Sequence, residues 1–207
     1  MTKSAHATSC SKTIHYWSGI TLSVFIGFHL FNQLTSLIGA DAHIKVMQAF
    51  RTVYRHPAVE TILLIAVLFQ AVTGLKMVFT RKRSSTVEKI QVYSGLYLSF
   101  FLFFHVGAVL YGRWLGMNTH FYFAAAGLNM YPAMFFFIPY YLLAVAGVTL
   151  HVAAVHYRKT GSLGWSRAIA ITGVLAALLI IIGFTNRFQW REIPPANKAF
   201  IQQSFGG

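Results

Sequence analysis

Acidic residues are scarce in this 207-residue chain, which has four Asp and Glu side chains against 17 Lys and Arg. Charged residues make up 10% of the sequence, although about a quarter is typical of soluble domains, and apolar residues make up 56%. The single cysteine, Cys10, excludes an internal disulfide and a cysteine-ligated iron–sulfur cluster. This composition is typical of a membrane protein.

Five apolar stretches are each long enough to cross a hydrocarbon layer of about 30 Å, which takes roughly 20 helical residues. The first has only a weakly basic leader and no small-residue cleavage site, so we interpret it as a retained span. We therefore expect a single all-α integral membrane domain over 1–207, with an amphipathic interfacial helix at 41–55 and an exposed tail at 188–207. The spans are expected near residues 14–38, 58–79, 91–113, 133–157 and 167–186.

The basic residues lie between the spans, where an excess of Lys and Arg marks the cytoplasmic side of a membrane protein. With a cytoplasmic N-terminus, ten of the 17 lie in inner segments: Lys3, Lys12, Lys76, Arg81, Lys82, Arg83, Lys89, Arg158, Lys159 and Arg167. The other seven lie in outer segments: Lys45, Arg51, Arg55, Arg113, Arg187, Arg191 and Lys198. This bias predicts a cytoplasmic N-terminus and an external C-terminus, and it explains the positive charge without nucleic acid.

Two of the spans share a pattern. Ser18 to His29 and Ser94 to His105 both read Ser-Gly-x-x-Leu-Ser-x-Phe-x-x-Phe-His. One span separates them, so they run in the same direction, and the spans that follow them run the other way. The pattern predicts that two parallel helix-pair repeats form a four-helix bundle, a fold that holds cofactors between facing helices.

Histidines inside spans are candidate functional residues because a bilayer penalises buried ionisable groups. The repeat places His29 and His105 at one depth, which favours bis-histidine ligation of a haem iron. Gln70 and His151 fall at a second, inner depth. The alternative is that these are core side chains hydrogen-bonded to neighbouring helices. The remaining histidines outside the spans are expected to face solvent: His6, His43, His56 and His120.

Four features resemble the cytochrome b membrane-anchor subunit of succinate dehydrogenases and fumarate reductases, in its single-chain, five-helix form. His15-x-x-Ser18-Gly19 is similar to the family's H-R-x-S-G, with Tyr16 in place of the arginine. The histidines at 29 and 105 resemble the ligands of the haem distal from the cytoplasm.

The other two features lie at the inner depth. His151 with Arg158 resembles the H-x-x-x-G-x-x-R stretch that follows the proximal ligand, with Val155 in place of the glycine. Gln70-x-x-x-Gly74-Leu75 matches the family's H-x-x-x-G-L, except that a glutamine replaces the histidine.

The resemblance implies that His29 and His105 are axial ligands of a haem b. His151 is then a candidate ligand of an inner haem, for which Gln70 replaces the expected partner. One haem b is expected, or two if the inner depth also binds one. Quinone is the expected substrate, with His15, Tyr16 and Ser18 as its candidate binding residues.

The resemblance further implies an electron-transfer subunit without catalytic residues of its own, in a bacterial cytoplasmic membrane. Flavoprotein and iron–sulfur subunits would bind its cytoplasmic face, and membrane lipid and quinone would be its other partners. The alternatives are a haem-free structural anchor, a stand-alone b-type cytochrome reductase, and a transporter or metal-ion carrier. The last is disfavoured because no Asp or Glu lies deep in a span.

Overall fold

The computed structural model describes residues 2–80 and 84–205, and the described chain is helical almost throughout. Five of its helices are long and apolar enough to cross a membrane, which confirms the prediction of an all-helical, multi-pass membrane protein. The elements are α1 (Thr2–Leu34), η1 (Thr35–Leu37), α2 (Ala40–Tyr54), α3 (Pro57–Thr80), α4 (Thr86–Trp114), α5 (Phe121–Asn129), α6 (Met134–Thr160), α7 (Leu163–Phe184) and α8 (Pro195–Phe205).

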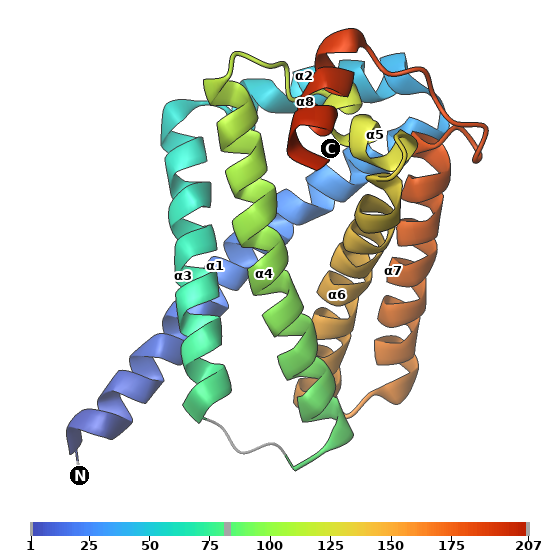
Figure 1. Cartoon of the computed structure of the whole chain (residues 1–207). Coiled ribbons are helices and arrows are strands. Elements are labelled where there is room, and N and C mark those ends of the chain that lie inside the picture. Colours follow the sequence, from blue (N-terminus) through green and yellow to red (C-terminus); the bar gives the residue numbers. More distant parts are fainter. Residues whose placement is uncertain (1, 81–83, 206–207) are drawn as a thin grey trace.

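In Figure 1, α3, α4, α6 and α7 are roughly upright and α1 crosses behind α3 and α4 at an angle; α1, α4 and α7 run toward the same end, and α3 and α6 run the other way. Helix α1 packs against α3, α3 against α4, α4 against α6 and α6 against α7, and α7 contacts α1 and η1. The short helices α2, α5 and α8 gather at one end of the molecule, which we call the cap end, and the N-terminus lies at the other (Figure 1). The long helices therefore form a ring around an interior.

Local sequence sets two of the helix boundaries on the side opposite the cap. Ser85 begins α4 with a capping box, in which its side chain accepts a hydrogen bond from the Glu88 backbone and the Glu88 carboxylate accepts one in return. Gly161 ends α6 in the left-handed conformation, with φ of 70°. Ser85 thus fixes where the α3–α4 connection ends, and Gly161 fixes where the α6–α7 connection begins.

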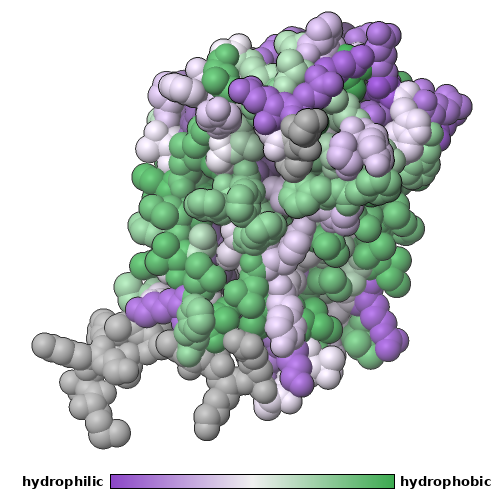
Figure 2. All heavy atoms as spheres, viewed as in Figure 1, coloured by the Kyte–Doolittle hydropathy of each residue, from purple (hydrophilic) through white to green (hydrophobic). Residues whose placement is uncertain are grey.

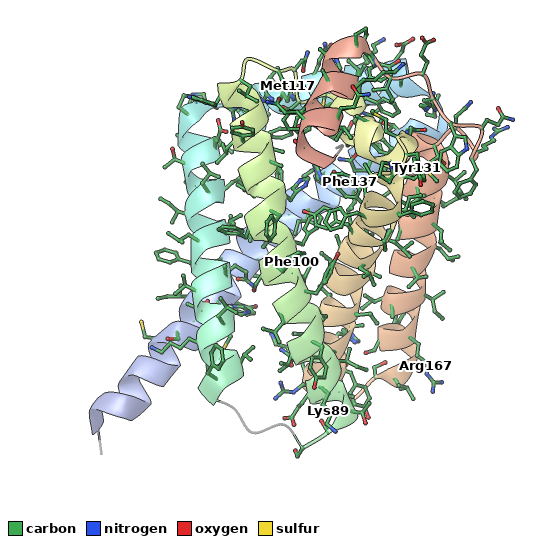
Figure 3. The ribbon with its side chains drawn as sticks, viewed as in Figure 1. Lys89, Phe100, Met117, Tyr131, Phe137 and Arg167 are labelled. Atoms are coloured by element: carbon green, nitrogen blue, oxygen red, sulfur yellow. The ribbon has the colours of Figure 1, made fainter. Side chains whose placement is uncertain are left out.

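The sides of the helix ring are apolar and exposed. None of the residues in the most apolar part of α4 is buried inside the molecule. Figure 2 shows a hydrophobic band around the middle of the visible face, with hydrophilic residues toward both ends. Figure 3 places Phe100 within this band, and Lys89 and Arg167 at the end opposite the cap. This distribution suits a protein surrounded by lipid.

The densest packing lies at the cap end. The core there contains Phe121 and Leu128 of α5, Phe184 of α7, and Ile193 and Ile201 of the C-terminal segment. The expectation of an exposed tail at 188–207 is therefore wrong in part, because Ile193 and Ile201 are only 2% and 4% exposed. Both side chains are apolar and remove surface from water by packing onto α5 and α7.

Candidate functional site

A cavity of about 1330 Å³ runs through the helix ring. It exceeds ordinary small-molecule pockets, which measure about 300–1,000 Å³. His29 and His105 line it toward the cap end, and Gln70 and His151 line it further from the cap. We call the first pair the outer tier and the second the inner tier. The interior of the bundle is thus large enough for a bulky apolar group.

The outer-tier imidazoles both line the cavity and lie close together, edge to face. The ring centroids of His29 and His105 lie 6.1 Å apart, with an angle of 68° between the ring planes. Two imidazole nitrogens at about 2 Å from a shared metal ion place the ring centroids roughly 6 Å apart. The pair and the surrounding space therefore fit an iron porphyrin held by two axial histidines.

Each outer-tier histidine is held by a phenylalanine one helical turn before it. Phe25 stacks on His29, with ring centroids 5.6 Å apart and an interplanar angle of 21°. Phe101 stacks on His105, at 4.9 Å and 14°. Because i and i+4 side chains are neighbours on a helix surface, the repeated Phe-x-x-x-His spacing produces both contacts.

The two imidazoles differ in their hydrogen bonds. The Gln33 amide nitrogen lies 3.1 Å from His29 Nε2, and His43 Nε2 lies 2.9 Å from Gln33 Oε1. Within the described part of the chain, no group hydrogen-bonds to His105. A polar group in an apolar span without a partner costs free energy, so His105 is available to a ligand. Metal ligation through His29 Nε2 would replace its contact with Gln33.

His43 corrects an expectation from the sequence, because it is buried at 2% exposure rather than facing solvent. Its ring packs edge-on between Phe121 and Phe184, at centroid distances of 5.2 and 5.3 Å. This burial, with the positive charge of nearby histidines and Arg51, lowers the pKa of His43 to about 4. The His29–Gln33–His43 chain thus joins the outer tier to the cap.

The other three histidines outside the spans were also expected to face solvent. His56 is exposed and His120 is half-buried, with its pKa lowered mainly by burial. The His6 side chain lies outside the described residues.

The inner tier contains a chain of hydrogen bonds centred on Gln70. Ser18 Oγ donates to Gln70 Oε1 at 2.7 Å, and Gln70 Nε2 donates to His15 Nε2 at 3.1 Å. His15 Nδ1 lies 3.0 Å from Thr73 Oγ1. Both ends of the Gln70 amide and both ring nitrogens of His15 are therefore in use.

His151 is oriented differently from Gln70. Its Nδ1 lies 3.0 Å from the Gln91 carbonyl oxygen and 3.3 Å from Ser94 Oγ. Since a carbonyl only accepts hydrogen bonds, Nδ1 carries the proton and Nε2 keeps its lone pair. The His151 ring is therefore held in the tautomer that a metal ligand needs.

The Ser-Gly pair of each repeat contacts the inner-tier side chain of the next antiparallel helix. Ser18 bonds Gln70 and Ser94 bonds His151. A Cβ added at Gly19 would meet the Gln70 amide at 3.4 Å, and one added at Gly95 would meet the His151 ring at 3.2 Å. Gln70 and His151 thus occupy matching surroundings.

The candidate quinone residues lie together on α1, away from the cap. His15 and Tyr16 line the cavity, and Ser18 is buried against Gln70. Tyr16 is 46% exposed, with the Lys159 ammonium 4.5 Å from its ring centroid. Only the Tyr16 ring of this set lies at the cavity mouth.

Three cavity-lining residues that interact with this site were not singled out from the sequence: Gln33, Arg51 and Arg55. Gln33 follows His29 by four residues, a spacing that could have indicated its contact. Arg51 lies on α2 and Arg55 is its C-cap residue, and no local signal in the sequence indicates that this helix faces the cavity.

Searches of protein families, curated proteins and solved structures find no match to this chain. Within residues 2–80 and 84–205, no three or more His, Cys, Asp or Glu side chains are grouped so as to hold a metal ion. The described residues offer one close pair of intramembrane histidines, His29 and His105, and the single His151 of the inner tier.

Proposed function

We propose that this chain is a membrane-anchoring b-type cytochrome subunit. It passes electrons between the iron–sulfur subunit of a succinate dehydrogenase or fumarate reductase and membrane quinone. The observation that carries this proposal is the His29–His105 pair, with ring centroids 6.1 Å apart across a cavity of about 1330 Å³.

Matched contacts support the origin of the bundle in two parallel helix-pair repeats. The Phe–His stack occurs on α1 and again on α4. In each repeat, a hydrogen bond joins the serine of the Ser-Gly pair to the following antiparallel helix, α3 or α6. A duplicated pair of helices gives a simple reason for both similarities.

At the outer tier, His29 and His105 would hold a haem b through their imidazole nitrogens, and the stacked Phe25 and Phe101 would keep the two rings oriented. The haem supplies one-electron chemistry at a potential that the surrounding protein sets. Ligation through His29 Nε2 would release the Gln33 amide nitrogen, while Gln33 Oε1 keeps its contact with His43. Apolar side chains of the four helices exclude water from the cavity.

At the inner tier, the proposal assigns no second haem. The Gln70 amide is occupied by Ser18 and His15, and a neutral amide is a poor iron ligand. His151 is left as a single candidate ligand with its Nε2 available. One haem b per chain is therefore the expected content.

The quinone is proposed to bind at the cavity mouth away from the cap. Tyr16 and Lys159 lie at the surface there, and the other two candidates, His15 and Ser18, lie behind them and are bonded to Gln70. Since Ser18 and His15 already bond to Gln70, the Tyr16 hydroxyl is the better candidate to bind a quinone carbonyl.

The orientation that supports electron transfer places the N-terminus in the cytoplasm and the cap outside. The flavoprotein and iron–sulfur subunits then bind the end opposite the cap, where the connections of α3 to α4 and α6 to α7 lie (Figure 1). Lys76, Lys89 and Arg167 lie in the segments near this face and suit an acidic partner or lipid surface.

Absorption spectra of three variants test the assignment. We expect the purified chain to show a b-type reduced-minus-oxidised spectrum that is lost in His29→Ala and in His105→Ala. His56→Ala is the matched control, because His56 is exposed in the connection between α2 and α3. An unchanged spectrum in both outer-tier variants would contradict the assignment.

A haem-free structural anchor is the second candidate, and the closed hydrogen-bond chain of the inner tier favours it. That candidate predicts a colourless protein that still co-purifies with soluble subunits.

A further inference from the structure

Arg51 of α2 and Arg55, which directly follows this helix, line the cavity near the cap, and neither forms a salt bridge within the described residues. Arg51 and Arg55 are one helical turn apart, and both are partly buried. In the described part of the chain the salt bridges are Arg113–Glu60 and Arg158–Glu88, and neither involves these two arginines. Because withdrawing a charge from water without a partner is costly, the two guanidinium groups form a cationic site that favours an anion.

Neutral groups of the connection after α4 orient these guanidinium groups. Arg51 donates to the Thr119 carbonyl at 2.8 Å and to the Asn118 side chain at 3.3 Å. Arg55 donates to Thr119 Oγ1 at 2.9 Å. A guanidinium has five N–H donors, and this contact leaves most of those on Arg55 unused.

The local field also favours an anion. Burial, together with repulsion from Arg55 and Arg113, lowers the pKa of Arg51. Glu60 faces this cluster from α3 but is held by Arg113. An anionic ligand would relieve the repulsion between Arg51 and Arg55.

These arginines lie close to the outer tier. Tyr54, between them on the same helix, contacts the Phe25 ring at a centroid distance of 5.5 Å. Phe25 in turn stacks on His29 at 5.6 Å. Two ring-to-ring contacts therefore connect the last turn of α2 to His29. This separation is comparable with the size of a porphyrin edge and its side arms.

We propose that Arg51 and Arg55 bind the carboxylates of the group that fills the outer half of the cavity. Under the proposed function, on which this inference rests, these carboxylates are the haem propionates. Guanidinium groups bind carboxylates with paired, charge-assisted hydrogen bonds, so they can fix the rotation of the macrocycle about the His29–His105 axis.

The test compares haem b with its dimethyl ester, which keeps the iron and the macrocycle but has no carboxylate charge. Full-length protein freed of haem is titrated with each in detergent. We expect the wild type to bind haem b about tenfold or more tightly than the ester. The Arg51→Gln/Arg55→Gln variant should bind both equally and at the affinity of the ester.

Two further variants make the result specific. Arg51→Lys/Arg55→Lys keeps the charge and should retain part of the preference. Arg187→Gln removes an exposed arginine near the cap and should retain all of it. Thermal unfolding of each haem-free variant shows that its fold is intact.

The outcomes separate this inference from the proposed function. Equal binding of haem b and the ester by the wild type overturns the carboxylate site and leaves the cytochrome assignment in place. A preference for haem b over the ester that survives Arg51→Gln/Arg55→Gln also overturns the carboxylate site. The same holds if an anionic phospholipid co-purifies only when both arginines are present and competes with neither porphyrin. Binding of neither compound overturns the cytochrome assignment itself.

Discussion

Replacing Gln70 with histidine tests the interpretation of the inner tier. The Gln70 amide accepts from Ser18 at 2.7 Å and lies 3.4 Å from the Cβ position of Gly19. His151 has the same kind of surroundings on the other helix pair, at 3.3 Å from a serine hydroxyl and 3.2 Å from a glycine Cβ position. An imidazole at residue 70 would therefore have the same kinds of neighbours as the imidazole of His151, a serine hydroxyl and a glycine.

The size of the effect follows from the lost contacts. Gln70→His removes the amide hydrogen bonds to Ser18 and His15. Side-chain hydrogen bonds between membrane helices average about 0.6 kcal/mol. The free energy of unfolding of the haem-free variant should then fall by about 1 kcal/mol, a decrease of about 2–4 °C in Tm. When haem is supplied, the second axial histidine should raise the haem content from one to two per chain.

The assay measures haem per chain and Tm for wild type, Gln70→His and Gln70→Ala. Gln70→Ala loses the same hydrogen bonds but supplies no ligand, so it should keep one haem and show only the decrease in Tm. A Gln70→His protein that folds and still holds one haem would refute the pairing of residues 70 and 151.

Two further predictions concern the cap. The pKa of His43 is lowered to about 4, so the folded state keeps this side chain neutral, whereas the unfolded state binds a proton below about pH 6.5. The contribution of neutral His43 to the free energy of unfolding is therefore complete above pH 6.5 and is lost as the pH falls toward 4. Thermal unfolding between pH 7 and 4.5 should show that the free energy of unfolding falls by up to about 3 kcal/mol, and His43→Gln should flatten this pH dependence. An identical pH dependence in both proteins would contradict the role given to His43. Gly183→Ala places a Cβ 2.8 Å from the Leu37 backbone nitrogen and should cost about 1–3 kcal/mol. Gly27→Ala has no atom within 4 Å of the new Cβ, so it serves as the control, and equal Tm values would disprove the close packing of α7 on η1.

The spans could be predicted from the sequence because hydropathy is a local property. The five apolar runs became the five long helices, and the caps at Ser85 and Gly161 place the start of α4 and the end of α6 outside the expected spans. The equal depth of His29 and His105 followed from the repeat, and the two rings do lie together. Their role as haem ligands stays a prediction.

The cap could not be predicted in the same way, because its packing joins residues far apart in sequence. His43 lies on an amphipathic helix, and contacts with residues on other elements, among them Phe121 and Phe184, bury it. The tail has polar residues around Ile193 and Ile201, so its local sequence indicates exposure. The orientation of Arg51 toward the cavity likewise depends on how α2 sits on the bundle.

Haem content of the purified full-length chain tests the central claim most directly. A pyridine haemochrome assay should give one haem b per chain, and none when His29 or His105 is replaced by alanine. No haem in the wild-type protein, with the chain folded and haem supplied during expression, would contradict the cytochrome assignment.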